Sequence, residues 1–256
     1  MIHPTAIIDK SAKIHERVQI GAYTTVGPEV EIFADCEIKA HVAIEGPTQI
    51  GPRCRIFPFA AIGLEPQDKK YHGENSLLVI GSDNLFREYV TLNRGSEAGG
   101  GVTKIGDHNW IMAYCHIAHD CQIGSHTVLA NGTTLGGHVE VGDYAVLGGL
   151  TAVHQFCRIG KYALTGGQSM IAQDAAPYMI VAGNRAKAAG LNFVGLERNG
   201  FSKADIEEIN QIYRIFFLSG LAKDPAIEKL RAERPAGPNL DLFINFINNS
   251  QRGVIR

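Results

Sequence analysis

The sequence predicts a parallel β-helix of triangular cross-section, followed by an α-helical region at the C-terminus. Aliphatic residues recur at every sixth position over long stretches of the first 171 residues. Gly-Pro pairs at positions 27, 46 and 51 would break an α-helix, whose period of about 3.6 residues also differs from six. Near residue 190 the period of six gives way to the spacing of amphipathic helices. These three observations define the fold class.

The period of six is carried by two runs of aliphatic residues. The first run is Ile2, Ile8, Ile14, Ile20, Val26, Ile32, Ile38, Ile44, Ile50, Ile56 and Ile62, and the second is Ile105, Ile111, Ile117, Ile123, Leu129, Leu135, Val141, Leu147, Val153 and Ile159. Six residues suit a short strand plus a corner, and three such units close one coil of about 18 residues. The aliphatic side chains then point inward and fill the core.

Cysteines follow the same repeat, because all five lie four residues after an aliphatic position. They are Cys36, Cys54, Cys115, Cys121 and Cys157. Cysteine behaves as a small apolar residue when buried, so we expect these side chains to pack in the core rather than to bind metal or form disulfides. An odd number of cysteines without CxxC pairs is typical of a reducing, cytoplasmic setting.

Two segments interrupt the repeat and a third region replaces it. Residues 64–78 are polar and residues 93–104 are rich in glycine, and loops that leave a rigid coil often carry binding residues. Further along, Ser202 and Asp205 have the spacing of a helix cap, an apolar face follows, and Gly220 ends the helix. We expect two more helices, at residues 225–234 and 238–250. We therefore expect a β-helix at 1–189 and a helical domain at 190–256.

Composition excludes several classes of function. Lys and Arg number 24 against 26 Asp and Glu, which gives a net charge of −2 and no basic excess for binding nucleic acid. No apolar stretch approaches the roughly 18 residues that a membrane span needs. The first ten residues have neither the basic nor the apolar segment of a secretion signal. We expect a cytoplasmic protein without a membrane span.

Histidines gather on one flank of the predicted coil. Residues 18 positions apart stack about 4.8 Å from one another in successive coils. His119 therefore stacks on Gly137 and Gly137 on Gln155, while Asp120 stacks on His138. The other members of this flank are His116, Gly136 and His154.

This cluster has the groups that general base catalysis needs. A histidine can take a proton from a hydroxyl group, a neighbouring carboxylate can orient the imidazole, and a glycine N–H can bind an oxyanion. The same histidines could instead bind zinc, as in the β-helical carbonic anhydrases. Spacing alone leaves both alternatives open.

Motifs along the whole chain are similar to those of one bacterial family. They read HIAHDC (116–121), GGHV (136–139), AVHQFC (152–157), PQDKKYHG (66–73), GLNFVGLERNGFS (190–202) and RGVIR (252–256). With these motifs the chain resembles the acyl-ACP–UDP-N-acetylglucosamine O-acyltransferases, hexapeptide-repeat enzymes that begin lipid A synthesis. The resemblance implies a left-handed coil, a 3-hydroxyacyl donor on acyl carrier protein, UDP-N-acetylglucosamine as acceptor, a homotrimer with sites at the subunit clefts, and no metal or other cofactor.

The resemblance also assigns roles to individual residues. It implies that His119 is the general base on the sugar 3-hydroxyl, Asp120 its orienting partner and Gly137 the oxyanion donor. It further implies substrate-positioning residues, namely His116, His138, His154, Gln155, Gln67, Asp68 and Lys70, and nucleotide contacts at Asn192 and Arg198.

Gly167 looks like the end of the acyl groove in this family, where a glycine goes with long acyl chains. Gly167 lies 48 residues after His119, a rise of about 13 Å at about 4.8 Å per coil. We expect the acyl chain to run along the prism axis between them.

Three positions depart from the family pattern and leave the acceptor open. They are Asn93, Val194 and Asn199, where other members carry different polar or charged residues. Some relatives act on the 3-amino analogue of the sugar and form an amide, so the acceptor could carry either group. Two further alternatives are an acetyl-CoA-dependent hexapeptide transferase and a β-helical scaffold without catalysis.

Overall fold

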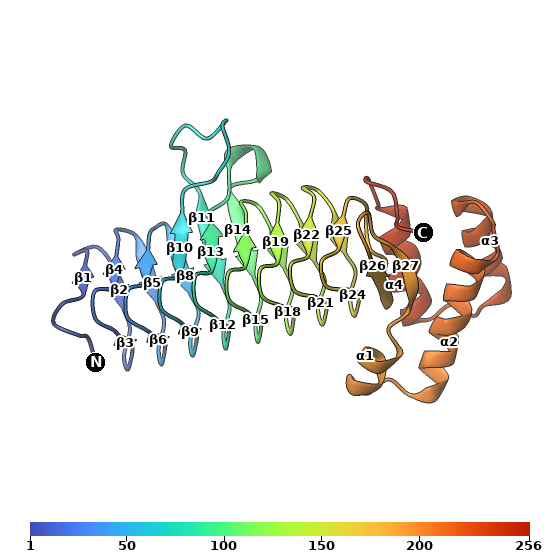
Figure 1. The fold of residues 1–256 in the computed structure, drawn as a ribbon, viewed down its shortest axis with the longest axis horizontal. Coiled ribbons are helices and arrows are strands. Elements are labelled where there is room, and N and C mark those ends of the chain that lie inside the picture. Colours follow the sequence, from blue (N-terminus) through green and yellow to red (C-terminus); the bar gives the residue numbers. More distant parts are fainter.

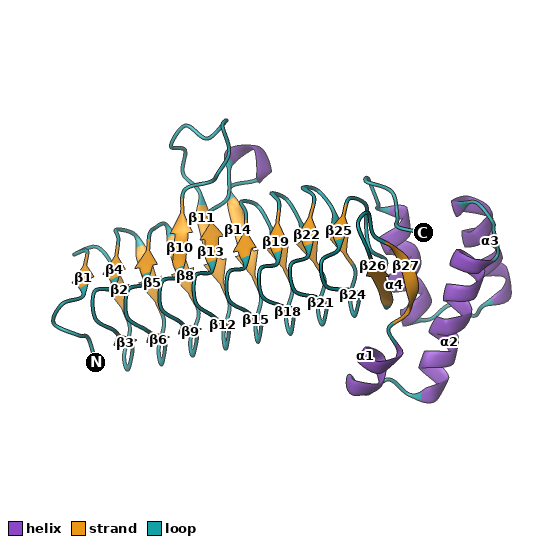
Figure 2. Cartoon of the chain, viewed as in Figure 1, coloured by secondary structure: helices purple, strands orange, loops and turns teal.

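A computed structural model describes residues 1–256 as a long triangular prism with a helical region at its C-terminal end (Figures 1 and 2). Three parallel sheets form the faces of the prism, and each coil contributes one short strand to each sheet. Successive strands of a sheet pair at the predicted spacing, since Ile117 pairs with Leu135 and Leu135 with Val153. Each six-residue repeat in the sequence therefore forms one strand and one corner, and three repeats form one coil.

Each sheet takes every third strand along the chain. Sheet 1 contains β1 (Ile7–Ile8), β4 (Thr25–Val26), β7 (Ala43–Ile44), β10 (Ala61–Leu64), β13 (Thr91–Asn93), β16 (His116–Ile117), β19 (Thr134–Leu135), β22 (Ala152–Val153) and β25 (Met170–Ile171). Sheet 2 contains β2 (Lys13–Ile14), β5 (Val30–Ile32), β8 (Thr48–Ile50), β11 (Leu77–Ile80), β14 (Val102–Ile105), β17 (Gln122–Ile123), β20 (Glu140–Val141) and β23 (Arg158–Ile159). Sheet 3 contains β3 (Gln19–Ile20), β6 (Glu37–Ile38), β9 (Arg55–Ile56), β12 (Leu85–Phe86), β15 (Trp110–Ile111), β18 (Val128–Leu129), β21 (Val146–Leu147), β24 (Leu164–Thr165), β26 (Met179–Ala182) and β27 (Lys187–Leu191).

The core of the prism consists of the aliphatic column that the sequence predicts. One continuous cluster of 39 buried apolar residues runs along the axis, and it includes all five cysteines, which are buried as free thiols. The expectation that the cysteines pack in the core is confirmed. This aliphatic column is open to solvent only at the first coil, where Ile2 is half exposed.

Corners of the prism place side chains in the left-handed backbone region. Asp120, His138 and Phe156 occupy the corner between sheets 1 and 2 with φ between 61° and 65°. This region costs an L-residue roughly 1–2 kcal/mol, which the pairing of the coils on either side offsets. Corner residues stack from coil to coil, as the rings of His138 and Phe156 do at 4.4 Å.

Two loops leave the prism side by side near its middle (Figure 1). One joins β10 to β11 and the other joins β13 to β14, the latter with a short 3-10 turn, η1 (Glu97–Gly99). They lie where the sequence predicts them, although strands extend a little into both expected segments. The loops contact each other, since the Leu77 N–H donates to the Gly101 carbonyl at 2.8 Å.

The C-terminal region packs its own core against the last coil. Its helices are α1 (Phe193–Arg198), α2 (Lys203–Tyr213) with a π-helical continuation, η2 (Arg214–Leu218), α3 (Lys223–Glu233) and α4 (Pro238–Asn248). The predicted capping box of Ser202 and Asp205 is present, and a second cluster of 16 buried residues joins these helices to the end of the prism. The sequence missed both α1 and the antiparallel strand β27, which pairs with β26.

The C-terminal segment returns to the prism, where Val254 forms an isolated β-bridge with Asp174. The Ile255 N–H donates to the Asp174 carbonyl at 2.9 Å, and the Ser250 hydroxyl donates to the Asp174 carboxylate at 2.6 Å.

The division into domains at 1–189 and 190–256 stays a prediction. No helix is both long and apolar enough to cross a membrane.

The core column gives a direct test of the repeat. Ile50 has 0% of its surface exposed, whereas its strand neighbour Gln49 points outward. We predict that Ile50→Ala lowers the free energy of unfolding by about 2–5 kcal/mol, because it leaves a cavity that the coils cannot close. Gln49→Ala should change it by no more than about 0.5 kcal/mol. Denaturant titration measures both, and equal effects would contradict the inward assignment.

Candidate active site

The corner between sheets 1 and 2 brings the predicted catalytic residues together. His119 and Asp120 turn the chain from β16 to β17, and Gly137 and His138 occupy the same turn one coil further on. The His138 N–H donates to the His119 carbonyl at 3.0 Å, and the Phe156 N–H donates to the Gly137 carbonyl at 3.1 Å. The coil geometry thus has the stacking that the sequence predicts.

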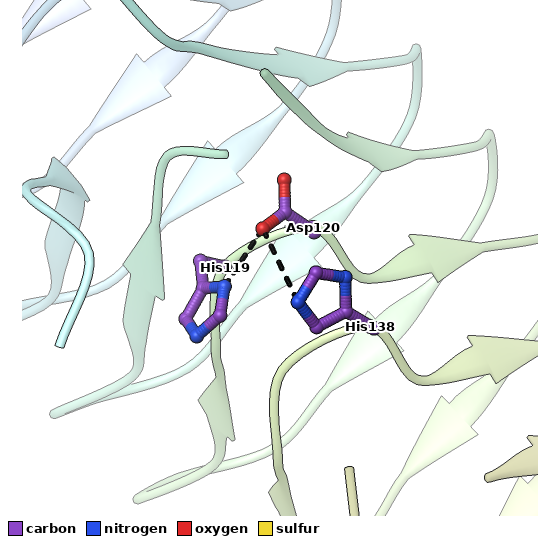
Figure 3. A group of neighbouring side chains, drawn as sticks. All are labelled: His119, Asp120 and His138. Carbon is purple, nitrogen blue, oxygen red and sulfur yellow. Dashed lines mark hydrogen bonds and ion pairs between the residues drawn. The ribbon is translucent and has the colours of Figure 1, made fainter. Parts of the chain in front are cut away.

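His119 and Asp120 form a buried hydrogen-bonded pair (Figure 3). The Nδ1 atom of His119 lies 2.7 Å from Oδ2 of Asp120, and the two residues are 9% and 4% exposed. A carboxylate accepts a hydrogen bond, so Nδ1 carries the proton and Nε2 is left as the basic nitrogen. His138 is the third member of the group, with Nε2 3.8 Å from the same carboxylate oxygen.

Gly137 lies against the imidazole of His119. A Cβ atom at this position would stand 2.6 Å from Cε1 and 2.7 Å from Nε2 of the ring, too close for any side chain. The Gly137 N–H donates no hydrogen bond within the chain. Glycine at this position therefore gives His119 its place and leaves a free backbone donor beside the basic nitrogen.

A groove of about 500 Å³ opens from this corner across the outer face of sheet 1. Its lining includes the predicted residues Gln67, His116, His119, Gly137, His154 and Gln155. His116 is held by the Thr91 hydroxyl, 2.7 Å from its Nδ1 atom, and His154 is held by Arg252, whose Nη2 lies 3.1 Å from Nδ1. Thr91 and Arg252 were missed as positioning groups, because neither lies 18 residues from its partner in the sequence.

The loop between β10 and β11 brings Asp68 close to the same histidines. A hydrogen bond from the Lys70 N–H lowers the pKa of Asp68, and the charges of His119 and His138 lower it further. Such charge effects require the groups to be near one another. Asp68 therefore lies near these histidines, and Lys70 donates to Asp68 from its backbone N–H at 3.0 Å.

Gly167 lies at a different corner from His119. It turns the chain from sheet 3 to sheet 1 and lines a separate hollow of about 660 Å³ with Tyr114, Asn131, Gly132, Gly149, Leu150 and Gln168. A path from His119 to Gly167 on one subunit must therefore cross the face of sheet 1. The expected run of the acyl chain along the prism axis stays a prediction.

The two predicted nucleotide contacts lie apart from the groove. Asn192 caps α1, where its Oδ1 accepts from the Gly195 N–H at 3.1 Å and its Nδ2 donates to the Tyr162 carbonyl at 2.9 Å. Both polar atoms of this side chain are thus used within the chain. Arg198 is exposed in the last turn of α1. Neither residue lines the groove of its own subunit.

The site also has the residue types of a metal centre. Ligand atoms of His119, Asp120 and His138 all lie within 4.8 Å of one another. Two ligands of a tetrahedral zinc ion stand about 3.3 Å apart when each bond is about 2.0 Å. The 2.7 Å contact between His119 and Asp120 is shorter and fits a hydrogen bond better.

Asp120 has further partners that the sequence did not reveal. Its N–H donates to the Thr103 hydroxyl at 2.7 Å, and Ser96 donates to its carboxylate from both the backbone and the side chain. The glycine-rich character of residues 93–104 indicated a loop, but no spacing rule assigned Ser96 a partner, since the loop breaks the repeat.

Comparisons with known proteins agree with this geometry. Residues 174–255 match the family model described as Udp N-acetylglucosamine O-acyltransferase, domain 2, and residues 103–137 match that of the bacterial transferase hexapeptide repeats. An acyl-[acyl-carrier-protein]–UDP-N-acetylglucosamine O-acyltransferase from Thermodesulfovibrio yellowstonii is 51% identical over 100% of this chain and 99% of its own, and one from Halorhodospira halophila is 49% identical with the same coverage.

Solved structures give the same result. The UDP-N-acetylglucosamine acyltransferase of Bacteroides fragilis superposes with a TM-score of 0.98 at 40% identity, covering 100% of both chains. That of Moraxella catarrhalis gives 0.97 at 45% identity, covering 100% of this chain and 99% of its own. The predicted fold class, a left-handed parallel β-helix with a C-terminal helical domain, is confirmed.

A hexapeptide-repeat prism with a histidine–carboxylate pair in a surface groove, matched in this way, is an acyltransferase rather than a scaffold. The chain belongs to the acyl-ACP–UDP-N-acetylglucosamine O-acyltransferase family.

The lowered pKa values of two site histidines determine how the stability of the fold depends on pH. Burial lowers the pKa of His116, with a contribution from the charge of His119, and burial also lowers that of His138. When the pH falls below 6.5, the ordinary pKa of histidine, the unfolded chain binds more protons at these residues than the folded chain does. Lowering the pH therefore favours unfolding. We predict that Tm falls between about pH 7 and pH 5. The variant with both His116→Gln and His138→Gln should show a smaller fall, and an equal fall would contradict this assignment.

Proposed function

We propose that this chain transfers a 3-hydroxyacyl group from acyl carrier protein to the 3-hydroxyl of UDP-N-acetylglucosamine, the step that begins lipid A synthesis. The names of its close relatives contain both substrates. The observation that carries the proposal is the His119–Asp120 pair, whose Nε2 atom lies beside the free Gly137 N–H at the edge of a groove.

The chemistry requires no covalent intermediate with the enzyme. The sugar hydroxyl attacks the thioester carbonyl carbon while Nε2 of His119 takes its proton, and the Gly137 N–H donates to the oxyanion that forms. Asp120 stabilises the imidazolium through Nδ1. When the intermediate collapses, the C–S bond breaks and the pantetheine thiolate takes the proton from His119. Direct transfer of this kind gives sequential rather than ping-pong kinetics.

Neighbouring side chains position the substrates around this centre. His116 and His138 are neutral at physiological pH because burial lowers the pKa of both, so they act as hydrogen-bonding groups rather than cations. His154, Gln155 and Gln67 line the same groove, and Asp68 and Lys70 follow Gln67 in its loop. We assign these residues to the sugar, the diphosphate and the beginning of the acyl chain.

A homotrimer completes the site in this proposal. The groove lies on one open face of the prism, and Arg198 and Gly167 lie outside it on their own subunit. A neighbouring copy supplies the missing wall, with Arg198 suited to bind the diphosphate and Gly167 the end of the acyl chain. Such an enzyme works in the cytoplasm, where the five buried free cysteines stay reduced.

The 3-amino sugar is the second candidate acceptor, and the three unusual positions bear on it. Asn93 is buried and donates to the Glu65 carbonyl at 2.6 Å, and Asn199 donates to the Gly195 carbonyl at 2.7 Å, so both act within the chain. Val194 is exposed on α1, beside Asn192. A nonpolar residue at this position weakens polar recognition of the nucleotide and does not by itself select the acceptor group.

The proposed base gives the first functional test. We predict that His119→Ala lowers kcat by about 100- to 10,000-fold, because the sugar hydroxyl loses its proton acceptor, while the fold and oligomeric state are kept. His126 is the matched control, an exposed histidine stacked at another corner, and His126→Ala should keep wild-type kcat. Thioester consumption measures both rates. If His119→Ala keeps more than half of wild-type kcat, another group is the base.

Gly167 gives a test of acyl-chain selection. A Cβ atom here would meet the Gly149 carbonyl at 3.4 Å, so a larger side chain would extend into the hollow at this corner. We predict that Gly167→Met shifts the preference from long to shorter 3-hydroxyacyl chains, with the best substrate turned over at nearly the wild-type rate because His119 is unchanged. Competition among acyl carrier protein donors measures the profile. An unaltered profile would place the end of the acyl groove elsewhere.

A further inference from the structure

The loop between β13 and β14 folds over the carboxylate of Asp120. The Ser96 N–H donates to Oδ1 at 2.8 Å and the Ser96 hydroxyl to Oδ2 at 2.6 Å. Ser96 is only 3% exposed, so both hydrogen bonds lie away from solvent. One residue of an otherwise glycine-rich loop therefore contacts both oxygens of the proposed catalytic carboxylate.

These two hydrogen bonds fix the rotation of the carboxylate. The terminal torsion of an aspartate has broad preferences, so the side chain alone does not decide which oxygen faces His119. Donors on both oxygens hold the carboxylate plane, and Oδ2 then lies 2.7 Å from Nδ1 of His119. The orientation of the imidazole, and the nitrogen that carries its proton, thus depend on a group that never approaches the substrate groove.

Gly99, in the same loop, also packs against this carboxylate. A Cβ atom at Gly99 would overlap the carboxylate carbon and both oxygens of Asp120. The loop backbone therefore packs directly on the carboxylate and excludes water from it. Water would compete for both oxygens, and its exclusion strengthens the bond to His119.

We propose that Ser96 is a positioning residue of the acyl transfer, acting through Asp120 on His119. The inference rests on the proposed function, since it assigns Ser96 a role only if His119 is the base. The loop between β13 and β14 accordingly exists to hold the catalytic pair, and its interruption of the coil at this place has a chemical reason.

Ser96→Ala tests the hydroxyl while keeping the backbone donor. We expect it to lower kcat about tenfold, equivalent to about 1.4 kcal/mol of transition-state stabilisation, with KM for both substrates within twofold of wild type. Ser96→Thr keeps the hydroxyl and should retain at least a third of wild-type kcat. In an Asp120→Ala background, Ser96→Ala should cost less than twofold, because its partner has gone.

A matched control exists elsewhere in the chain. The Ser250 hydroxyl donates to the buried carboxylate of Asp174 at the same distance, 2.6 Å, outside the groove. Ser250→Ala should lower Tm and leave kcat unchanged, which separates a general loss of stability from a loss of positioning.

Three results would overturn the inference. They are a kcat for Ser96→Ala within twofold of wild type, an equal loss in Ser96→Thr, and an undiminished loss in the Asp120→Ala background. If His119→Ala is inactive while any of these occurs, the inference alone fails. If His119→Ala is active, the proposed function fails first.

Discussion

Hydrogen bonding between successive coils fixes each residue of the prism relative to the residue one coil away. The pairing of Ile117 with Leu135 and Val153 is one instance among three sheets. The aliphatic column inside and the stacked corners outside both follow from it. A side chain placed at one corner is therefore held by a rigid backbone rather than by a flexible loop. His119 is an example, because its turn is hydrogen-bonded to the turn of Gly137 and His138 in the next coil.

The buried carboxylate is the costly part of this site. Removing Asp120 from water is unfavourable unless its oxygens are hydrogen-bonded. The corner itself supplies only His119 and the more distant His138, so the remaining donors come from the loop that carries Ser96. The prism thus positions Asp120 beside His119, and the loop provides the hydrogen bonds with which the carboxylate can stay buried and oriented.

Sequence reasoning succeeded wherever the period held. It placed the core, the cysteines, the two loops and the stack of His119 on Gly137, because spacing in the chain translates directly into distance. It failed where the period is broken. Ser96 and Thr91 lie 24 and 25 residues from their partners, and the capping role of Asn192 belongs to α1, a helix that no repeat indicates. The strand β27 has no repeat signal and follows from its antiparallel pairing with β26.

Identification of the product tests the central claim most directly, which is metal-free transfer from thioester to sugar hydroxyl by the His119–Asp120 pair. The purified protein would be given a 3-hydroxyacyl thioester of acyl carrier protein and UDP-N-acetylglucosamine, with and without a strong chelator, and the product analysed by mass spectrometry and NMR. The account predicts an ester at the 3-position, formed at the same rate in both conditions, with no acylated enzyme. Loss of activity with the chelator, an acyl-enzyme adduct, or turnover of the 3-amino sugar alone would contradict it.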